Sequence, residues 1–167
     1  MNNRPSIGLI GINGYYTSYI DSYRAASAIY GLNLIADSGA QVSIEKGLTV
    51  EKILKYLSLN RRERQIPYSL YITDEDLKDE RDNSLFGISD PKLKIAVLSE
   101  LRLASEPQLA RERLMKEAAH LIGHFFGLGH CSNRNCIMSY AVNLRQVDDK
   151  YPALCSDPTS RCNCGRP

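Results

Sequence analysis

The sequence predicts an α/β (α+β) fold in a single domain. Strand-like and helix-like segments follow one another in the order β, α, α, β, β, β, and a long helix comes after them. No repeat, low-complexity stretch or Pro/Gly/Ser-rich linker divides the chain. With 167 residues, 43% of them hydrophobic and 24% charged, the chain is long enough to bury one substantial core. We therefore expect residues 1–167 to form one domain.

The first half of the chain is expected to contain one strand and two helices. Ile7–Ile12 is predicted as a strand that ends at the Asn13-Gly14 turn. Apolar and aromatic residues then recur with helical spacing from Thr17 to Tyr30, which predicts a helix packed on that strand. A second helix is expected to begin after Thr49, a residue type that often caps helices, and to end near three solvated arginines: Arg61, Arg62 and Arg64.

Three more strands are predicted in the middle of the chain, over Tyr68–Ile72, Leu85–Ile88 and Lys94–Ser99. Six carboxylates lie between the first two of these strands, from Asp74 to Asp82. Such a cluster can bind calcium, but it lacks the Asp-x-[Asp/Asn]-x-[Asp/Asn]-Gly order of an EF-hand loop. A solvated loop is the favoured interpretation.

A long helix is predicted after the strands. Ser105 is a suitable N-cap, Pro107 suits the first turn, and Gln108 three residues after the serine completes a capping-box pattern. The helical period of apolar residues continues to Phe125, and Gly127 is expected to end the helix.

Charge and cysteine content narrow the classes of partner and compartment. Twenty-one Lys plus Arg against nineteen Asp plus Glu leave a net charge of +2, too weak a bias to favour nucleic acid or an anionic membrane as a partner. No apolar run has the length of a membrane span, and because residues 1–6 are polar we expect no secretory leader. Five cysteines, an odd number, then favour a reducing cytoplasmic compartment, where clustered cysteines more often bind metal than form disulfides.

The three histidines form the most informative pattern. His120 and His124 are four residues apart, so their imidazoles project from one face of the predicted helix. Gly127 can adopt the left-handed conformation that turns the chain back and brings His130 toward the pair. Three neutral nitrogen ligands leave a tetrahedral zinc ion one open position, as in catalytic zinc sites.

The segment His120–His130 resembles the zinc motif HExxHxxGxxH of the metzincin peptidases. The string continues with Cys131, Cys136 and Met138, and HC-x4-C-x-M is similar to the signature of the archaemetzincin family in particular. The specific resemblance covers residues 117–164, and Met138 matches the methionine that lies under the metal in metzincins.

The resemblance implies a fold and an activity. Archaemetzincins are zinc-dependent metallopeptidases, so we expect a small mixed, twisted sheet with helices and an active-site helix that ends in a glycine turn. Residues 127–167 would follow residues 1–126 as a C-terminal subdomain stapled by zinc. The edge strand of the sheet, expected near Lys94–Ser99, would pair with a peptide or protein substrate in extended form.

The sequence departs from this pattern at Leu121. The family places there the glutamate that accepts a proton from the zinc-activated water, and loss of a general base costs about 10² to 10⁴ in rate. Glu117, one helical turn earlier, is a possible substitute base, although a helix residue without a catalytic role is the simpler interpretation. Tyr140 is placed like the Met-turn tyrosine of astacins and serralysins and is expected either to stabilise an oxyanion or to be a core aromatic residue.

The resemblance also implies a second, structural zinc ion. Pro158 stands where the family has its last cysteine, and reading Asp157–Ser160 as an insertion restores the CxxC spacing. Cys164 is the alternative fourth ligand, and thiols without a metal are the alternative to the whole site. We expect a closed site with four thiolate ligands: Cys131, Cys136, Cys155 and Cys162.

Three functional hypotheses follow. The first is an archaemetzincin-like, two-zinc metallopeptidase whose activity is weak or absent because of Leu121. The second is a zinc-binding pseudo-protease that acts as a peptide-binding or regulatory module. The third is a zinc-dependent hydrolase of a substrate other than a peptide.

Overall fold

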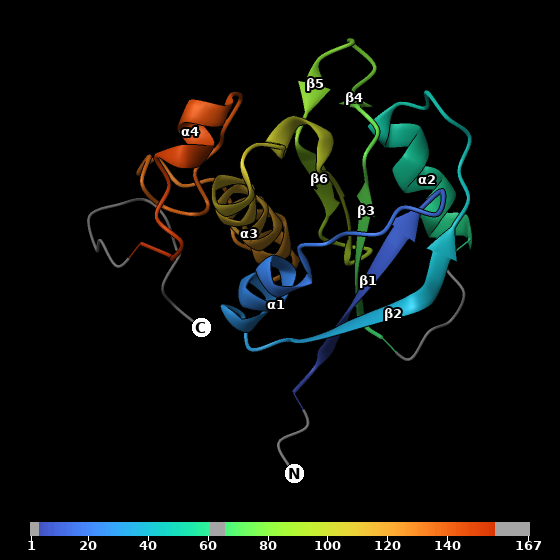
Figure 1. The fold of residues 1–167 in the computed structure, drawn as a ribbon, viewed down its shortest axis with the longest axis horizontal. Helices are drawn as coiled ribbons and strands as arrows, with labels where there is room; N and C mark the ends of the chain where they lie inside the picture. Colours follow the sequence, from blue (N-terminus) through green and yellow to red (C-terminus); the bar gives the residue numbers. More distant parts are fainter. Residues whose placement is uncertain (1–3, 61–65, 156–167) are drawn as a thin grey trace.

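The computed structural model describes residues 4–60 and 66–155, and its secondary structure alternates between strands and helices (Figure 1). In chain order the elements are β1 (Ser6–Ile12), α1 (Ile20–Ala28), β2 (Asn33–Val42), α2 (Val50–Asn60), β3 (Tyr68–Thr73), β4 (Leu77–Lys78), β5 (Ser84–Leu85), β6 (Gly87–Asp90), β7 (Ile95–Ser99), a 3-10 turn (Leu101–Leu103), α3 (Pro107–Phe125) and α4 (Leu144–Asp148).

The main sheet is mixed, with the strand order β2-β1-β3-β7-β6. β1 pairs in parallel with β2 and β3, and β3 pairs in parallel with β7. β6 runs antiparallel to β7 and forms one edge. The predicted α/β fold with a small mixed, twisted sheet is confirmed.

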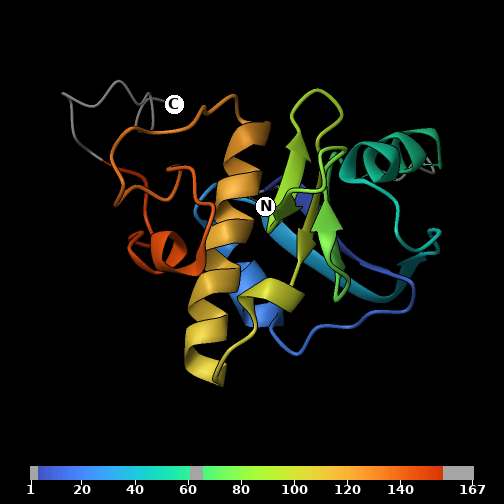
Figure 2. The ribbon, with the colours of Figure 1, turned by 90° about the horizontal axis from the view of Figure 1, so that it is seen from above.

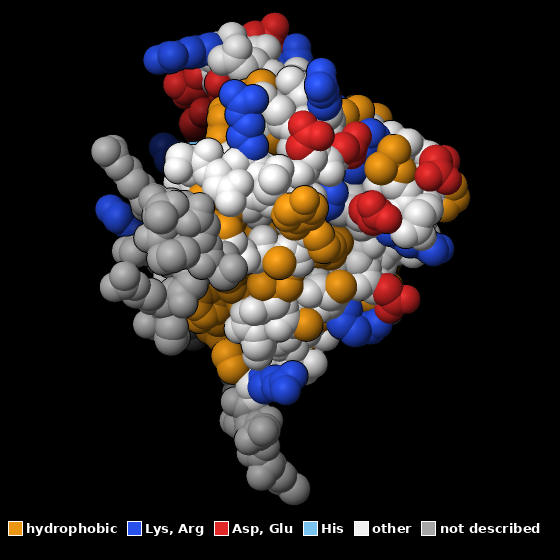
Figure 3. All heavy atoms as spheres, turned by 90° about the vertical axis from the view of Figure 1, so that its left-hand side faces the viewer, with side chains coloured by type: hydrophobic (Ala, Val, Ile, Leu, Met, Phe, Trp, Pro, Cys, Tyr) orange, Lys and Arg blue, Asp and Glu red, His pale blue; other side chains and the backbone are white. Residues whose placement is uncertain are grey.

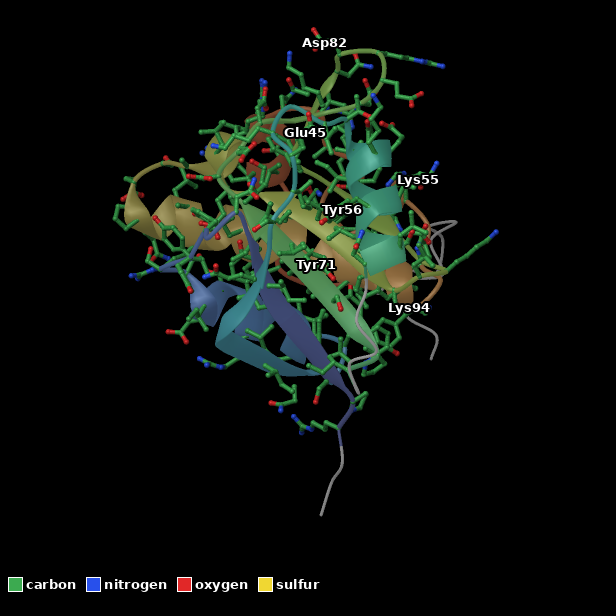
Figure 4. The ribbon with its side chains drawn as sticks, turned by 90° about the vertical axis from the view of Figure 1, so that its right-hand side faces the viewer. Glu45, Lys55, Tyr56, Tyr71, Asp82 and Lys94 are labelled. Atoms are coloured by element: carbon green, nitrogen blue, oxygen red, sulfur yellow. The ribbon has the colours of Figure 1, made fainter. Side chains whose placement is uncertain are left out.

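Helices cover both faces of this sheet. α1 and α3 pack together on one face, where α3 also contacts β6 and β7 (Figures 1 and 2). α2 lies on the opposite face, and its Ile53 and Leu57 form a separate core with Tyr71 of β3 (Figure 4). α3 is buried along most of its length because residues 127–155 pack on the side of α3 away from the sheet (Figure 2).

The distribution of charged side chains on the surface agrees with the weak net charge of +2. Figure 3 shows the side that carries α4, where positive and negative side chains are interspersed and hydrophobic side chains lie across the middle of the view. Among the described residues, no helix combines the length and the apolar content needed to cross a membrane.

Two expectations about the strands were incomplete or wrong. β2 was not predicted, because its sequence contains Asp, Ser and Gly, residue types that are depleted in strands. The strand predicted at Lys94–Ser99 is β7, which lies between β3 and β6 and is buried at all five residues. The edge strand is instead β6, because the chain returns antiparallel to it after the Asp90-Pro91 turn.

Details of the helix starts also differ from the predictions. The N-cap of α3 is Glu106 rather than Ser105, and no side chain caps this end; Pro107 occupies the first turn as expected. Thr49 directly precedes α2, but its buried hydroxyl finds no hydrogen-bond partner among the described residues. The three arginines expected at the end of that helix lie outside the described residues.

The acidic stretch from Asp74 to Asp82 is more ordered than a plain solvated loop. Within it, β4 pairs with β5 to form a short hairpin. The Asp79 carboxylate accepts hydrogen bonds from the backbone N–H groups of Arg81 and Asn83 at the turn. The Asp79 carboxylate therefore stabilises the turn of this hairpin.

Candidate metal centre

The three histidines converge at the C-terminal end of α3. The Nε2 atoms of His120 and His124 lie 3.3 Å apart, and the His130 ring lies 5.2 Å and 5.1 Å from theirs, centroid to centroid. One nitrogen of each ring lies within 4.8 Å of the others. A tetrahedral zinc ion with Zn–N bonds of about 2.0–2.1 Å needs ligand atoms about 3.3 Å apart, which matches the first pair.

The helix end explains how His130 reaches the pair. The Leu128 N–H donates to the Gly123 carbonyl, and Gly127 is left-handed with φ +79°. His124 Nδ1 then lies 2.8 Å from the Leu128 carbonyl oxygen, and His120 Nδ1 lies 3.1 Å from that of Ile137. These carbonyls hold the proton on Nδ1 and leave Nε2 as the acceptor, the arrangement found around metal-binding histidines.

Burial keeps the imidazoles neutral. Desolvation, followed by the positive charge of Lys150, lowers the pKa of His120 from 6.5 to about 3. The pKa values of His124 and His130 are also lowered, in both cases chiefly by burial. A neutral imidazole is the form that binds metal, so the site suits a cation at neutral pH.

Met138 packs against Gly123 of the histidine-bearing helix. The Tyr30 hydroxyl donates to the Ala119 carbonyl at 2.9 Å and lies 3.6 Å from the Met138 sulfur. Tyr30 also stacks on Phe126 just past the helix end, with ring centroids 5.4 Å apart. Sequence reasoning missed this tyrosine, because nothing in the chain order links position 30 to position 138.

The histidines line a pocket of about 290 Å³ beside the edge strand β6. Leu121 forms part of its wall and packs against Gly87 of that strand. Tyr140 lies at the rim, 58% exposed, with its ring centroid 5.1 Å from that of His130. It is therefore a pocket residue and not a core aromatic. Among the described residues that line the pocket, Glu117 carries the single carboxylate.

Glu117 forms a buried ion pair that sequence reasoning did not anticipate. Its Oε1 accepts a hydrogen bond from Lys150 Nζ at 2.6 Å. Burial raises the pKa of Glu117, and the ammonium of Lys150 acts in the opposite direction. Lys150 follows α4 in a polar stretch of sequence, so no local pattern marked it as a buried residue.

A second cluster begins at the residue after His130. The Sγ atoms of Cys131, Cys136 and Cys155 lie within 4.8 Å of one another, and those of Cys131 and Cys155 are 3.6 Å apart. Thiolates around zinc lie about 3.8 Å apart for Zn–S bonds of about 2.3 Å. Burial raises the pKa of Cys131 to about 12, so a metal that binds this thiol as thiolate must displace its proton. Cys162 and Cys164 lie outside the described residues.

Comparison with known proteins agrees with this geometry. The sequence model of Peptidase family M54 matches residues 37–163. The chain belongs to Peptidase family M54. Its curated relatives in this family of zinc metallopeptidases include archaemetzincins of Methanopyrus kandleri, 45% identical over 87 residues, and Pyrococcus abyssi, 29% identical over 151 residues.

The length of the aligned region differs between these two relatives. The aligned region covers 52% of this chain and 50% of the Methanopyrus kandleri protein, but 86% of this chain and 79% of the Pyrococcus abyssi protein. In sequence, the aligned part of the chain thus spans about half the length of the first of these relatives.

Solved structures of the M54 family share the fold. The crystal structure of archaemetzincin from Methanopyrus kandleri matches with a TM-score of 0.81 and 27% identity, covering 93% of this chain and 91% of that one. The archaemetzincin of Archaeoglobus fulgidus, solved in complex with malonate, matches with a TM-score of 0.70 and 28% identity, covering 90% and 96%.

Proposed function

We propose that this chain is an archaemetzincin-like zinc metallopeptidase whose hydrolysis of peptides is weak, because Leu121 replaces the general base. The supporting observation is that the nitrogens of His120, His124 and His130 converge on a pocket whose described lining contains one carboxylate. Zinc held by these nitrogens supplies Lewis-acid chemistry: it activates water and polarises a peptide carbonyl.

The remaining roles fall to three side chains of the pocket. Leu121 offers no atom that accepts a proton, so the usual route is blocked at that position. Glu117 is the proposed substitute proton acceptor, because it carries the single carboxylate among the described residues that line the pocket. Its Oε1 accepts a hydrogen bond from Lys150 Nζ. The Tyr140 hydroxyl, exposed at the rim next to His130, is placed to donate a hydrogen bond to a developing oxyanion.

The proposed substrate is an extended peptide or protein segment. β6 borders the pocket through residues 87–89 and is an edge of the main sheet, so a peptide strand can pair with its backbone. Pairing through backbone groups holds a substrate with little demand on its sequence. This role was first expected for Lys94–Ser99 and moves to β6 because β7 has a neighbour on both sides.

We propose a second, structural zinc ion at the cysteine cluster, bound by Cys131, Cys136 and Cys155. Cys162 is the proposed fourth thiolate and Cys164 its alternative. A closed site of this kind would staple the C-terminal segment to the end of α3, where Cys131 follows His130 directly. A cytoplasmic location, inferred from the cysteine content, accompanies this proposal.

A pseudo-protease that binds peptides without cleaving them is the second candidate. The observation in its favour is that Leu121 is buried and fits closely against Gly87, where an added Cβ would lie 2.7 Å from Leu121 Cδ1. An apolar wall of this kind favours binding of apolar side chains over proton transfer.

Metal analysis and a cleavage assay test the proposal. Purified protein should contain close to two zinc ions per chain, and His120→Ala should remove one of them. Slow, chelator-sensitive cleavage of a peptide library supports the peptidase, whereas binding without cleavage supports the pseudo-protease. Folded wild-type protein that contains no metal would contradict both.

A further inference from the structure

The most buried ion pair between described residues joins α3 to the segment after α4. Lys150 Nζ lies 2.6 Å from Glu117 Oε1, and the two side chains are 0% and 7% exposed. The neighbouring pair Arg113 and Asp148 joins α3 to the last residue of α4, and its side chains are 9% and 34% exposed. Both pairs therefore connect α3 to the α4 region, but they differ in burial.

The buried pair faces the histidine centre. Glu117 precedes His120 by three residues, so the two side chains lie on neighbouring positions of one helical face. Glu117 also lines the pocket that the three histidines line. The Lys150 ammonium lies 2.6 Å from Glu117 Oε1, so it is held next to the same pocket.

A buried ammonium ion is an obstacle to holding a dication nearby. In a desolvated site the repulsion between two positive charges is screened far less than in water. The Glu117 carboxylate, in contact with Lys150 Nζ, cancels that charge at short range. Removing one member of a buried pair leaves the other uncompensated, whereas replacing both by neutral groups is often tolerated.

We propose that Glu117 and Lys150 form a charge-compensating pair that sets the metal affinity of the histidine centre, with Glu117 as the residue that permits a dication beside the buried Lys150. This inference rests on the proposed zinc function. In this role both side chains are positioning residues, which act on the centre through its electrostatic potential. It also gives the two single substitutions opposite effects on zinc affinity.

A substitution cycle measured by zinc competition with a chelator tests the pair. In Glu117→Gln, the uncompensated Lys150 should weaken zinc binding at the histidine centre by about tenfold or more. Glu117→Gln combined with Lys150→Met should bind zinc within about threefold of wild type, because no charge remains. Lys150→Met alone should bind about tenfold tighter than the double variant, because only it retains the carboxylate.

Two further variants distinguish the histidine site from the cysteine site and an electrostatic effect from a loss of stability. His120→Ala reports zinc binding at the cysteine cluster alone and is subtracted. Asp148→Asn breaks the neighbouring pair, which includes the hydrogen bond from Arg113 Nε at 2.7 Å, and should lower stability while changing zinc affinity by less than about twofold.

The outcomes distinguish the possibilities. If Glu117→Gln does not fold, the comparison of Lys150→Met with the double variant still decides, and equal zinc affinities there overturn the proposal. If the double variant binds zinc as weakly as Glu117→Gln, the pair only stabilises the contact between α3 and the segment after α4. That result also overturns the proposal. Wild-type protein that binds no zinc at the histidines overturns the proposed function itself.

Discussion

Gly123 and Met138 meet at the floor of the histidine centre with no space for a methyl group between them. A Cβ at position 123 would overlap the Met138 sulfur and would lie 2.6 Å from the Tyr30 hydroxyl oxygen. Gly123 also lies between His120 and His124 on α3. The close approach of helix, methionine and tyrosine therefore depends on a missing side chain.

Gly123→Ala should lower the free energy of unfolding by about 1–3 kcal/mol, because the overpacked floor must shift. Chemical denaturation measures the effect. Gly129→Ala is the matched control, since a Cβ there meets no described atom within 4 Å and should leave stability nearly unchanged. Equal effects of the two substitutions would show that the floor is not tightly packed.

Tyr30→Phe should cost about 1 kcal/mol, the typical value of one hydrogen bond, because it removes the bond to the Ala119 carbonyl and keeps the stacked ring. Denaturant midpoints report the change. Tyr151, 65% exposed, provides the control substitution Tyr151→Phe, for which no change is expected. A Tyr30→Phe protein as stable as wild type would contradict the anchoring role of the hydroxyl.

Gly127 and Gly47 separate backbone strain from metal binding. Both have positive φ, +79° and +75°, and neither would place a Cβ within 4 Å of a described atom. Alanine at either position should therefore cost a similar amount, about 1 kcal/mol. Only Gly127→Ala should also weaken zinc binding, because it disturbs the turn that delivers His130. Zinc competition on both variants checks this, and equal zinc affinities would contradict the role of the turn.

The zinc-free protein should lose stability in mild acid. The pKa of His120 is about 3 in the folded state and 6.5 in the unfolded chain, so the unfolded state binds more protons between these values. Stability therefore falls as the pH is lowered from 6.5 toward 3, and this group contributes no dependence above that range. Thermal unfolding in the presence of a chelator measures the slope. His120→Asn should reduce the slope, and an unchanged slope would contradict the burial of a neutral imidazole.

Local sequence patterns were sufficient to predict that the three histidines converge. The spacing of His120 and His124 is a property of one helix, and the turn before His130 depends on a single glycine, Gly127. Both follow from backbone geometry within eleven residues. Cys131 and Cys136, which continue the motif, are also close in sequence, whereas Cys155 joins them from a distance.

Long-range relationships were not predictable in the same way. The order of strands in the sheet depends on crossovers, so the sequence of β7 could not show that β6 would cover its edge. Lys150 lies in a polar stretch, and its burial depends on meeting Glu117 of α3. Such pairs leave no periodic signal, because neither residue looks unusual beside its own neighbours.

Peptide hydrolysis by Leu121→Glu, compared with wild type, tests the central claim most directly. Leu121→Gln controls for polarity without a base. If Leu121 stands where the general base belongs, kcat/KM of the zinc-loaded protein for a peptide library should rise about 10²-fold or more in Leu121→Glu. It should stay near the wild-type value in Leu121→Gln. Wild-type protein that already cleaves the library as fast as Leu121→Glu would contradict the claim and point to another proton acceptor in the pocket.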